Sequence, residues 1–438
     1  MARMKSLACI LCLAAIAVSA PASASRLTTV IDSFEHRLDR DVEFSISAGW
    51  DFSTQSGVIR REFRCISYDL ASGSLCPSGS KIIDVDELKV ARDIHRLNLD
   101  FEIGFWRFAQ VHINVPIVLA DQTNLEHAKG VNALNTSVDP QESPSLFSLP
   151  FTGMERAGIA DPTLGVRFIP YSFERDPTRP TWSVGLDLTL PLASTKTADN
   201  DAVGEGLWRI VLSTAISTRA TPWFEPYFRV DGTFQMPAKN SPFEQLGKTQ
   251  TLVSPGHQLA IGMGTQFIPY ENPEKGESFV IDMGGSVRFH FEGRAYTDLF
   301  EALGTSQCDP RDPTDPCDLT TFTRGDLDPN TGATLKTDGL TDIEQYATIG
   351  GWLGFRWQMI QNLEFQAKFQ FAYDSDHFLT TADAGKDLDD INQVEKKNSM
   401  GENEYNPVYN DAYDSLGHRF LTGNVFRLGA QVSLVGKF

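Results

Sequence analysis

Long stretches of the chain alternate hydrophobic and polar residues one by one. The clearest is residues 424–438, where Phe426 and Leu428 are hydrophobic and the intervening Arg427 and Gln431 are polar. Successive side chains of a β-strand point to opposite faces. The segment therefore predicts a strand with one apolar and one polar face.

Twelve segments of this kind occur along the chain. They cover residues 42–52, 97–105, 109–119, 164–168, 182–192, 208–216, 224–234, 259–267, 279–291, 347–357, 363–371 and 424–438. The connections are alternately short (106–108, 172–180, 219–222, 271–277 and 361–362) and mostly long (53–94, 120–159, 193–206, 237–256, 293–344 and 374–419). This alternation with an even strand count is typical of outer-membrane barrels. The pattern predicts an all-β fold, a transmembrane antiparallel up-and-down β-barrel of about twelve strands with long extracellular loops and short periplasmic turns.

Both ends of the chain agree with this fold class. Arg3 and Lys5 precede an apolar stretch, and Ala22-Ser23-Ala24 matches a signal-peptide cleavage site. We predict a signal peptide over 1–24, a periplasmic segment over 25–40 that is either a short helix or unordered, and a barrel over 41–438 in the outer membrane of a Gram-negative bacterium. The last strand resembles the closing strand of such barrels, which often ends in Phe. The expected partners are therefore membrane lipid and, through Phe438, the barrel-assembly machinery.

The chain is acidic, but unevenly. It has 57 acidic and 38 basic residues, and removal of the signal peptide with its two basic residues leaves a net charge of −21. Two of the long predicted loops, within residues 292–344 and 374–414, carry −16 of this charge. Such acidity argues against nucleic acid as a partner.

The polar faces of the strands carry charges of both signs, which we predict to line the lumen. The acids are Glu43, Asp51, Asp100, Glu102, Asp187, Glu225, Asp282 and Glu364, and the bases are Arg96, Arg167, Arg209, Arg229, Arg288, Arg356, Lys368 and Arg427. Such arrays set ion preference in a pore. Alternatively, they pair across neighbouring strands and fill a narrow barrel, and a strand number of twelve is compatible with both.

Aromatic residues gather near strand ends, where we expect them at the membrane–water interface. They are Trp50, Trp106, Tyr171, Trp182, Trp208, Trp223, Tyr270, Trp352 and Trp357.

Four cysteines remain after cleavage. Proximity in the sequence favours the disulfides Cys65–Cys76 and Cys308–Cys317 in an oxidising compartment. Their spacing does not indicate a metal site, and we expect no cofactor. A weak calcium candidate has oxygen ligands at Asp326, Asp328 and Asn330, but its glycine comes one place late and position twelve lacks Glu. A solvated acidic turn is the alternative.

A catalytic site is not apparent. His290 shares a strand face with Ser286, but four residues of strand separate them by about 13 Å, too far for direct proton transfer. His112 has no nucleophile nearby in the pattern. We predict that the protein is not an enzyme and has no catalytic residues.

One region has a more specific likeness. It comprises Gly-Ile-Ala-Asp-Pro-Thr-Leu-Gly at residues 158–165, Leu-Thr-Leu-Pro at 188–191, and the prolines of 218–227. These motifs resemble the outer-membrane barrel family of the meta-pathway of phenol degradation, although Ala160 replaces that family's second glycine. The resemblance implies a channel for small, hydrophobic or aromatic compounds.

The leading hypothesis is therefore an outer-membrane channel or passive transporter for small solutes. The alternative is a filled barrel that serves adhesion or surface structure through acidic, disulfide-closed loops. A barrel hydrolase is a third and weaker hypothesis. The pattern leaves the solute and the oligomeric state open.

Overall fold

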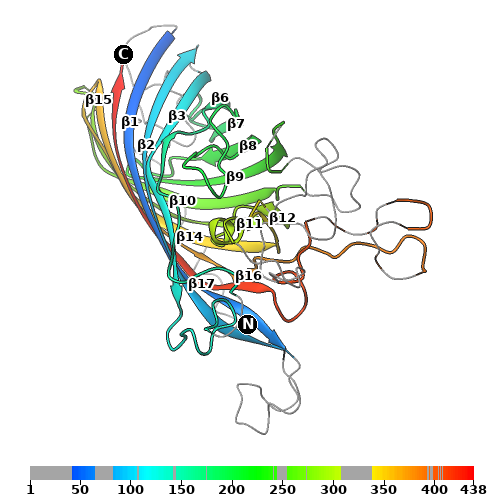
Figure 1. The fold of residues 1–438 in the computed structure, drawn as a ribbon. Coiled ribbons are helices and arrows are strands. Elements are labelled where there is room, and N and C mark those ends of the chain that lie inside the picture. Colours follow the sequence, from blue (N-terminus) through cyan, green and yellow to red (C-terminus); the bar gives the residue numbers. More distant parts are fainter. Residues whose placement is uncertain are drawn as a thin grey trace, which may run out of the picture.

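The wall of the molecule is a closed antiparallel sheet of twelve strands. The computed structural model describes residues 42–64, 82–105, 108–141, 145–173, 175–239, 241–243, 254–272, 274–306, 338–391, 394, 398–402, 404, 406 and 408–438. The strands follow one another around the wall, and the last pairs with the first, which closes the barrel (Figure 1). In order they are β1 (Val42–Arg64), β2 (Ile82–Phe105), β3 (Ala109–His127), β6 (Thr163–Tyr171), β7 (Thr181–Thr189), β8 (Leu207–Ser217), β9 (Phe224–Pro237), β10 (Gln258–Asn272), β11 (Glu277–His290), β14 (Tyr346–Ile360), β15 (Leu363–Asp374) and β17 (Phe420–Lys437). The predicted fold class and all twelve strands are confirmed.

The two rims of the barrel differ. Short turns connect the strands at one rim, here called the turn end, where the C-terminus also lies (Figure 1). Long connections gather at the other rim, the loop end. At the seam, Phe44 and Phe438 exchange two backbone hydrogen bonds and stack their rings at 5.1 Å. The terminal residue is thus part of the wall.

The wall is higher on one side than on the other. β1 and β2 have 23 and 24 residues, whereas β6 and β7 have nine each. The prediction of a loop over residues 53–94 is therefore wrong for 53–64 and 82–94, which are strand. In these added parts of β1 and β2, the inward residues Ile59, Leu88 and Val90 are apolar and fully buried. The prediction that inward residues are polar therefore does not hold near the loop end.

These inward side chains are apolar because a folded cap covers the loop end. We define the cap as the described parts of residues 128–150, 296–306 and 379–419. It contains the short helix α1 (Phe300–Gly304), and its buried Phe147, Leu299 and Leu303 form one hydrophobic cluster with the upper wall. The remaining strands are short and lie in the connections at this end: β4 (Phe151–Thr152), β5 (Arg156–Ile159), β12 (Gly293–Ala295), β13 (Thr341–Ile343) and β16 (His377–Phe378).

None of the described helices is long and apolar enough to cross a membrane.

Candidate functional site

A cavity of about 800 Å³ lies inside the barrel and is the candidate site. Its lining comes from β1, β2 and β6 and, for the larger part, from β9, β10, β11, β14, β15 and β17. Of the sixteen charged residues predicted for the lumen, seven border this lumen cavity: Glu102, Arg167, Arg229, Asp282, Arg288, Lys368 and Arg427. An adjoining space of about 110 Å³ shares Asp282 and Lys368 with the cavity and adds Arg356.

The other predicted lumen residues lie elsewhere along the wall. Asp51 is directly opposite Arg96 in the pairing of β1 with β2, and Asp100 accepts hydrogen bonds from Ser47 and Asn114. Asp187 pairs with His112, and Arg209 with Glu205. Glu225 and Glu364 are buried, the latter accepting a bond from Lys437 at 3.0 Å, and Glu43 is half-buried. Whether any of these residues contacts a solute stays a prediction.

Two aromatic side chains lie against the inner wall of the cavity. In the register of β9, β10, β11 and β14, Tyr227, Gly264, Gly284 and Trp352 form one continuous row. A side chain at either glycine would collide with the Tyr227 ring or the Trp352 indole. The two glycines are therefore what allows both rings to lie over the sheet.

Both rings point their polar atoms at one carboxylate. Tyr227 Oη donates to Asp282 Oδ1 at 2.6 Å, and Trp352 Nε1 approaches the same oxygen at 3.4 Å. The Lys368 ammonium lies 5.3 Å from the centre of the Trp352 ring, within cation–π range. The expectation that Trp352 sits at the membrane interface is wrong. The alternation along the strand could have shown that Trp352 faces the lumen, because Trp352 and Arg356 are four residues apart and so lie on the same, polar face.

The loop side of the cavity is bounded by a chain of polar contacts. His290 Nε2 lies 3.1 Å from Thr348 Oγ1, which donates to Asp374. Arg427 donates to Asp374 and to Gln55, and Gln55 donates to Asp298 of the cap at 2.8 Å. The cavity wall is thus connected, side chain by side chain, to the segment that covers it.

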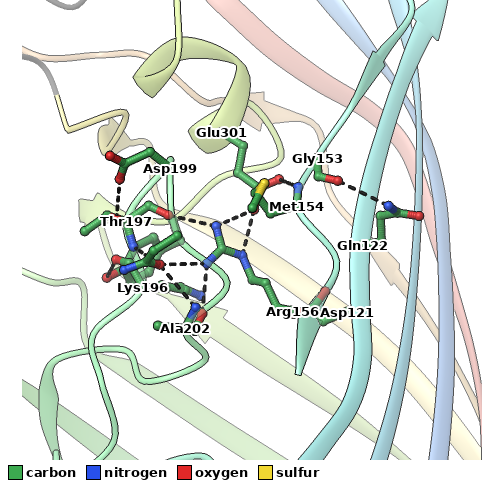
Figure 2. A network of polar contacts seen from close by, with 12 residues as sticks. Asp121, Gln122, Gly153, Met154, Arg156, Lys196, Thr197, Asp199, Ala202 and Glu301 are labelled. Carbon is green, nitrogen blue, oxygen red and sulfur yellow. Dashed lines mark hydrogen bonds and ion pairs between the residues drawn. The ribbon is translucent and has the colours of Figure 1, made fainter. Parts of the chain in front are cut away.

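The cap segment around α1 is held by a buried ion pair. Arg156 of β5 contacts Glu301 of α1, with Nη2–Oε1 at 2.5 Å and Nε–Oε1 at 2.7 Å. The same guanidinium donates to the carbonyl oxygens of Thr197 and Ala202, so one side chain joins three connections (Figure 2). Sequence reasoning missed both charges because they lie in loops, where no periodicity marks an inward position.

A second cation supports the same segment. The Lys196 ammonium lies 3.9 Å from the centre of the Tyr296 ring. Burial lowers the pKa of Lys196 to about 8, although the nearby Glu205 carboxylate acts in the opposite direction. Burial also raises the pKa of Asp298. The loop end therefore contains titratable groups within an otherwise packed cap.

The motif at residues 158–165 has a structural explanation. Asp161 is buried and accepts backbone hydrogen bonds from Ala193 at 2.9 Å and Glu205 at 3.0 Å. Its carboxylate thereby holds both ends of the connection between β7 and β8. That connection in turn supplies Thr197 and Ala202 to Arg156.

Several predictions lie outside the described residues. These are the signal peptide, the segment 25–40, Trp106, the four cysteines with their disulfides, and the calcium candidate Asp326, Asp328 and Asn330. Within the described chain, the carboxylates of Asp387, Asp389 and Glu404 lie close together. Their oxygens already accept backbone N–H bonds from Leu388, Asp390 and Ser399.

No family model matches the chain, and no curated protein matches it. Similar solved structures include an outer-membrane channel from Pseudomonas putida F1, with 11% identity, coverage of 92% of this chain and 99% of that chain, and a TM-score of 0.41. The CymD monoaromatic hydrocarbon channel has 9% identity, coverage of 90% and 88%, and a TM-score of 0.32. The outer-membrane protease OmpT from Escherichia coli has 9% identity, coverage of 90% and 97%, and a TM-score of 0.28. At such scores the fold class rests on the strand order rather than on these similarities.

The outer surface of the wall indicates the compartment. Large apolar side chains project outward along the strands and are 40% exposed or more, among them Phe44, Ile46, Phe101, Leu212, Met263, Phe369 and Leu434. Soluble proteins rarely expose so wide an apolar belt. A closed wall leaves no unpaired strand edge, as the bilayer requires. The chain is an outer-membrane β-barrel.

Proposed function

We propose that the protein is a passive outer-membrane channel for small solutes, which pass through the charge-lined lumen. The observation that carries the proposal is the lumen cavity, which lies within the wall and is bordered by eight charged side chains. Its volume of about 800 Å³ is within the range of sites for small organic molecules. A solid lumen, the filled alternative, would leave no such space.

Small aromatic compounds are the solute class that we propose. Trp352 borders the cavity with a large apolar surface, and Tyr227 lies beside it. Aromatic rings favour offset or edge contacts with other rings, and the charged groups around them would hold polar substituents. The family resemblance of residues 158–227 implies the same class.

The cap limits this passage from the loop end. Because Gln55 joins the cavity-lining Arg427 to Asp298 of the cap, we expect a narrow channel with small conductance rather than the open pore of larger barrels. We propose no catalytic role, since His112 is paired with Asp187, and the Thr348 hydroxyl beside His290 donates its hydrogen to Asp374 rather than to the imidazole.

The test uses the refolded mature protein in planar bilayers and in liposomes. We expect discrete conductance steps and influx of small solutes. Ser286→Trp places a large side chain in the cavity lining and should reduce both signals. Met283→Trp is the matched control, because Met283 lies on the same strand and faces outward with 42% of its surface exposed. A wild-type protein without conductance and without solute flux would refute the channel.

A surface or adhesion role is the second candidate, and the folded cap favours it. Phe147 and Leu303 pack in one hydrophobic cluster with the upper wall, which gives the described part of the cap a fixed place at the loop end. Deletion of residues 307–337 should then abolish attachment of cells to a surface or partner and leave permeability unchanged. Unchanged attachment after the deletion would contradict this role.

A further inference from the structure

The lumen cavity is locally positive in a strongly acidic chain. Five basic side chains border it, Arg167, Arg229, Arg288, Lys368 and Arg427, against three acidic ones, Glu102, Asp231 and Asp282. The whole sequence has a net charge of −19. At 0.1 M salt, exposed charges beyond a Debye length of about 10 Å are largely screened. The charges of the lining therefore matter more to a solute in the lumen than those of distant loops.

The acids of the cavity are already engaged by the protein. Asp282 accepts a hydrogen bond from Tyr227, with the Trp352 indole nearby. Asp231 accepts from Arg229 Nε at 2.7 Å, and Glu102 accepts from Ser45 at 3.1 Å. Arg229 thus neutralises Asp231, whereas Asp282 and Glu102 keep their charge and accept hydrogen bonds from neutral hydroxyl groups.

Three inward cations have no such partner. Among the residues that the structure describes, Arg288, Lys368 and Arg356 form no salt bridge, although the more distant Asp282 and Asp51 carboxylates act on Lys368, which also lies against the Trp352 ring. A cation in the lumen that is not held in a salt bridge attracts a mobile ion of opposite sign. Each of the three is thus a potential contact for an anion.

The three cations are spread along the passage. Arg288 is opposite Thr348 of β14, Lys368 is opposite Gly354, and Arg356 lies on β14 itself. Measured along β14, the three cations therefore lie at the heights of residues 348, 354 and 356. Eight residues of strand extend over roughly 27 Å, close to the height of about 25 Å of the apolar band of a membrane barrel.

We propose that Arg288, Lys368 and Arg356 form an anion track, and that the lumen selects small anions, carboxylates in particular, over cations. A carboxylate would contact Arg288 near the loop end, then Lys368 beside Trp352, and then Arg356 toward the turn end. Several weak sites in series favour both entry and release of an ion. The inference rests on the proposed channel function and narrows the proposed aromatic solutes to those that carry a negative group such as a carboxylate.

The test is the reversal potential of the refolded mature protein in a planar bilayer under a KCl gradient. We expect a chloride-to-potassium permeability ratio above unity, and acetate should carry current when it replaces chloride. The triple variant Arg288→Gln/Lys368→Gln/Arg356→Gln should lower the ratio to unity or below. The matched control is Lys89→Gln/Lys129→Gln/Lys239→Gln, which removes the same charge at exposed positions of the loop end and should keep the wild-type ratio.

The possible failures are distinguishable. A conducting wild-type channel that prefers potassium overturns the anion track and leaves the channel function intact. A triple variant that conducts with the wild-type ratio also overturns the track. A wild-type protein without conductance overturns the channel function itself, and the track with it. If the triple variant does not fold, the single variant Lys368→Gln is measured, and a ratio equal to that of the wild type overturns the track.

Discussion

Arg156 and Glu301 form a buried ion pair at 2.5 Å between two connections that are 145 residues apart in the sequence. Both side chains are at most 10% exposed. The pair fixes α1 over the mouth of the barrel, so it connects the packing of the cap to the accessibility of the lumen cavity. Its removal should therefore be visible both in stability and in conductance.

Arg156→Ala should strongly destabilise the cap. The change leaves the Glu301 carboxylate buried without its partner, which typically costs about 3–5 kcal/mol. Limited proteolysis should cut the cap faster, and the conductance of the channel should rise. Arg179→Ala is the control, because Arg179 pairs with Asp176 on the surface, where a pair contributes about 0–1 kcal/mol. Equal protease resistance of the two variants would contradict the role of the buried pair.

The connection between β7 and β8 should depend on Asp161. Asp161→Ala leaves the N–H groups of the half-buried residues Ala193 and Glu205 without their acceptor, at a cost of up to about 1 kcal/mol each. Asp161→Asn keeps one carbonyl oxygen and should lose less. Hydrogen exchange at residues 193–205 measures the effect. The prediction fails if the Ala and Asn variants exchange at the wild-type rate.

The cap should become more stable as the pH rises from 8 toward 10. Burial lowers the pKa of Lys196 to about 8 in the folded protein, while the unfolded chain keeps a pKa near about 10.4. At pH values between these two pKa values, Lys196 is protonated more in the unfolded than in the folded protein, so the free energy of unfolding increases with pH. The slope is at most about 1.4 kcal/mol per pH unit for one group.

Protease resistance of the cap at pH 8 and at pH 9.5 tests this dependence. Lys196→Met removes the titrating group but retains an apolar chain against Tyr296. The variant should lose the increase that the wild type shows. An equal increase in both proteins would assign the dependence to other groups.

Gly264→Ala and Gly284→Ala should each displace an aromatic ring from the cavity wall. The added methyl groups collide with Tyr227 and Trp352 respectively, and overpacking of this kind typically costs about 1–3 kcal/mol. Gly232→Ala is the control, because a side chain there meets only the Phe234 ring at an ordinary 3.7 Å. Thermal unfolding and tryptophan fluorescence should separate the variants, and Gly284→Ala should change the fluorescence most.

The wall could be predicted from the sequence because each strand repeats one simple physical condition, lipid on one face and polar lumen on the other. The closing strand near Phe438 and the inward position of Arg288 follow from this period of two. The upper parts of β1 and β2 break the condition, since Ile59 and Leu88 face an apolar cap rather than water. The contact of Arg156 with Glu301 has no local signal, because it joins loops whose positions depend on the finished barrel. The role of the Gly264–Gly284 pair required the register of four strands at once.

The cap has a consequence for how the protein assembles. Its hydrophobic cluster takes side chains from Ile59 near the start of the barrel to Phe420 in the last strand, and Arg61 donates to the carbonyl oxygen of Ala412 across 351 residues. Ile59 and Arg61 lie on β1 and Phe420 on β17, and these strands become neighbours only when the seam closes, so the cluster is complete only after closure. We expect the barrel to be sealed into the membrane before its mouth is covered, so that a newly inserted molecule is leaky for a time. A transient rise in vesicle permeability during insertion, followed by a fall to the level of the mature protein, would record that order.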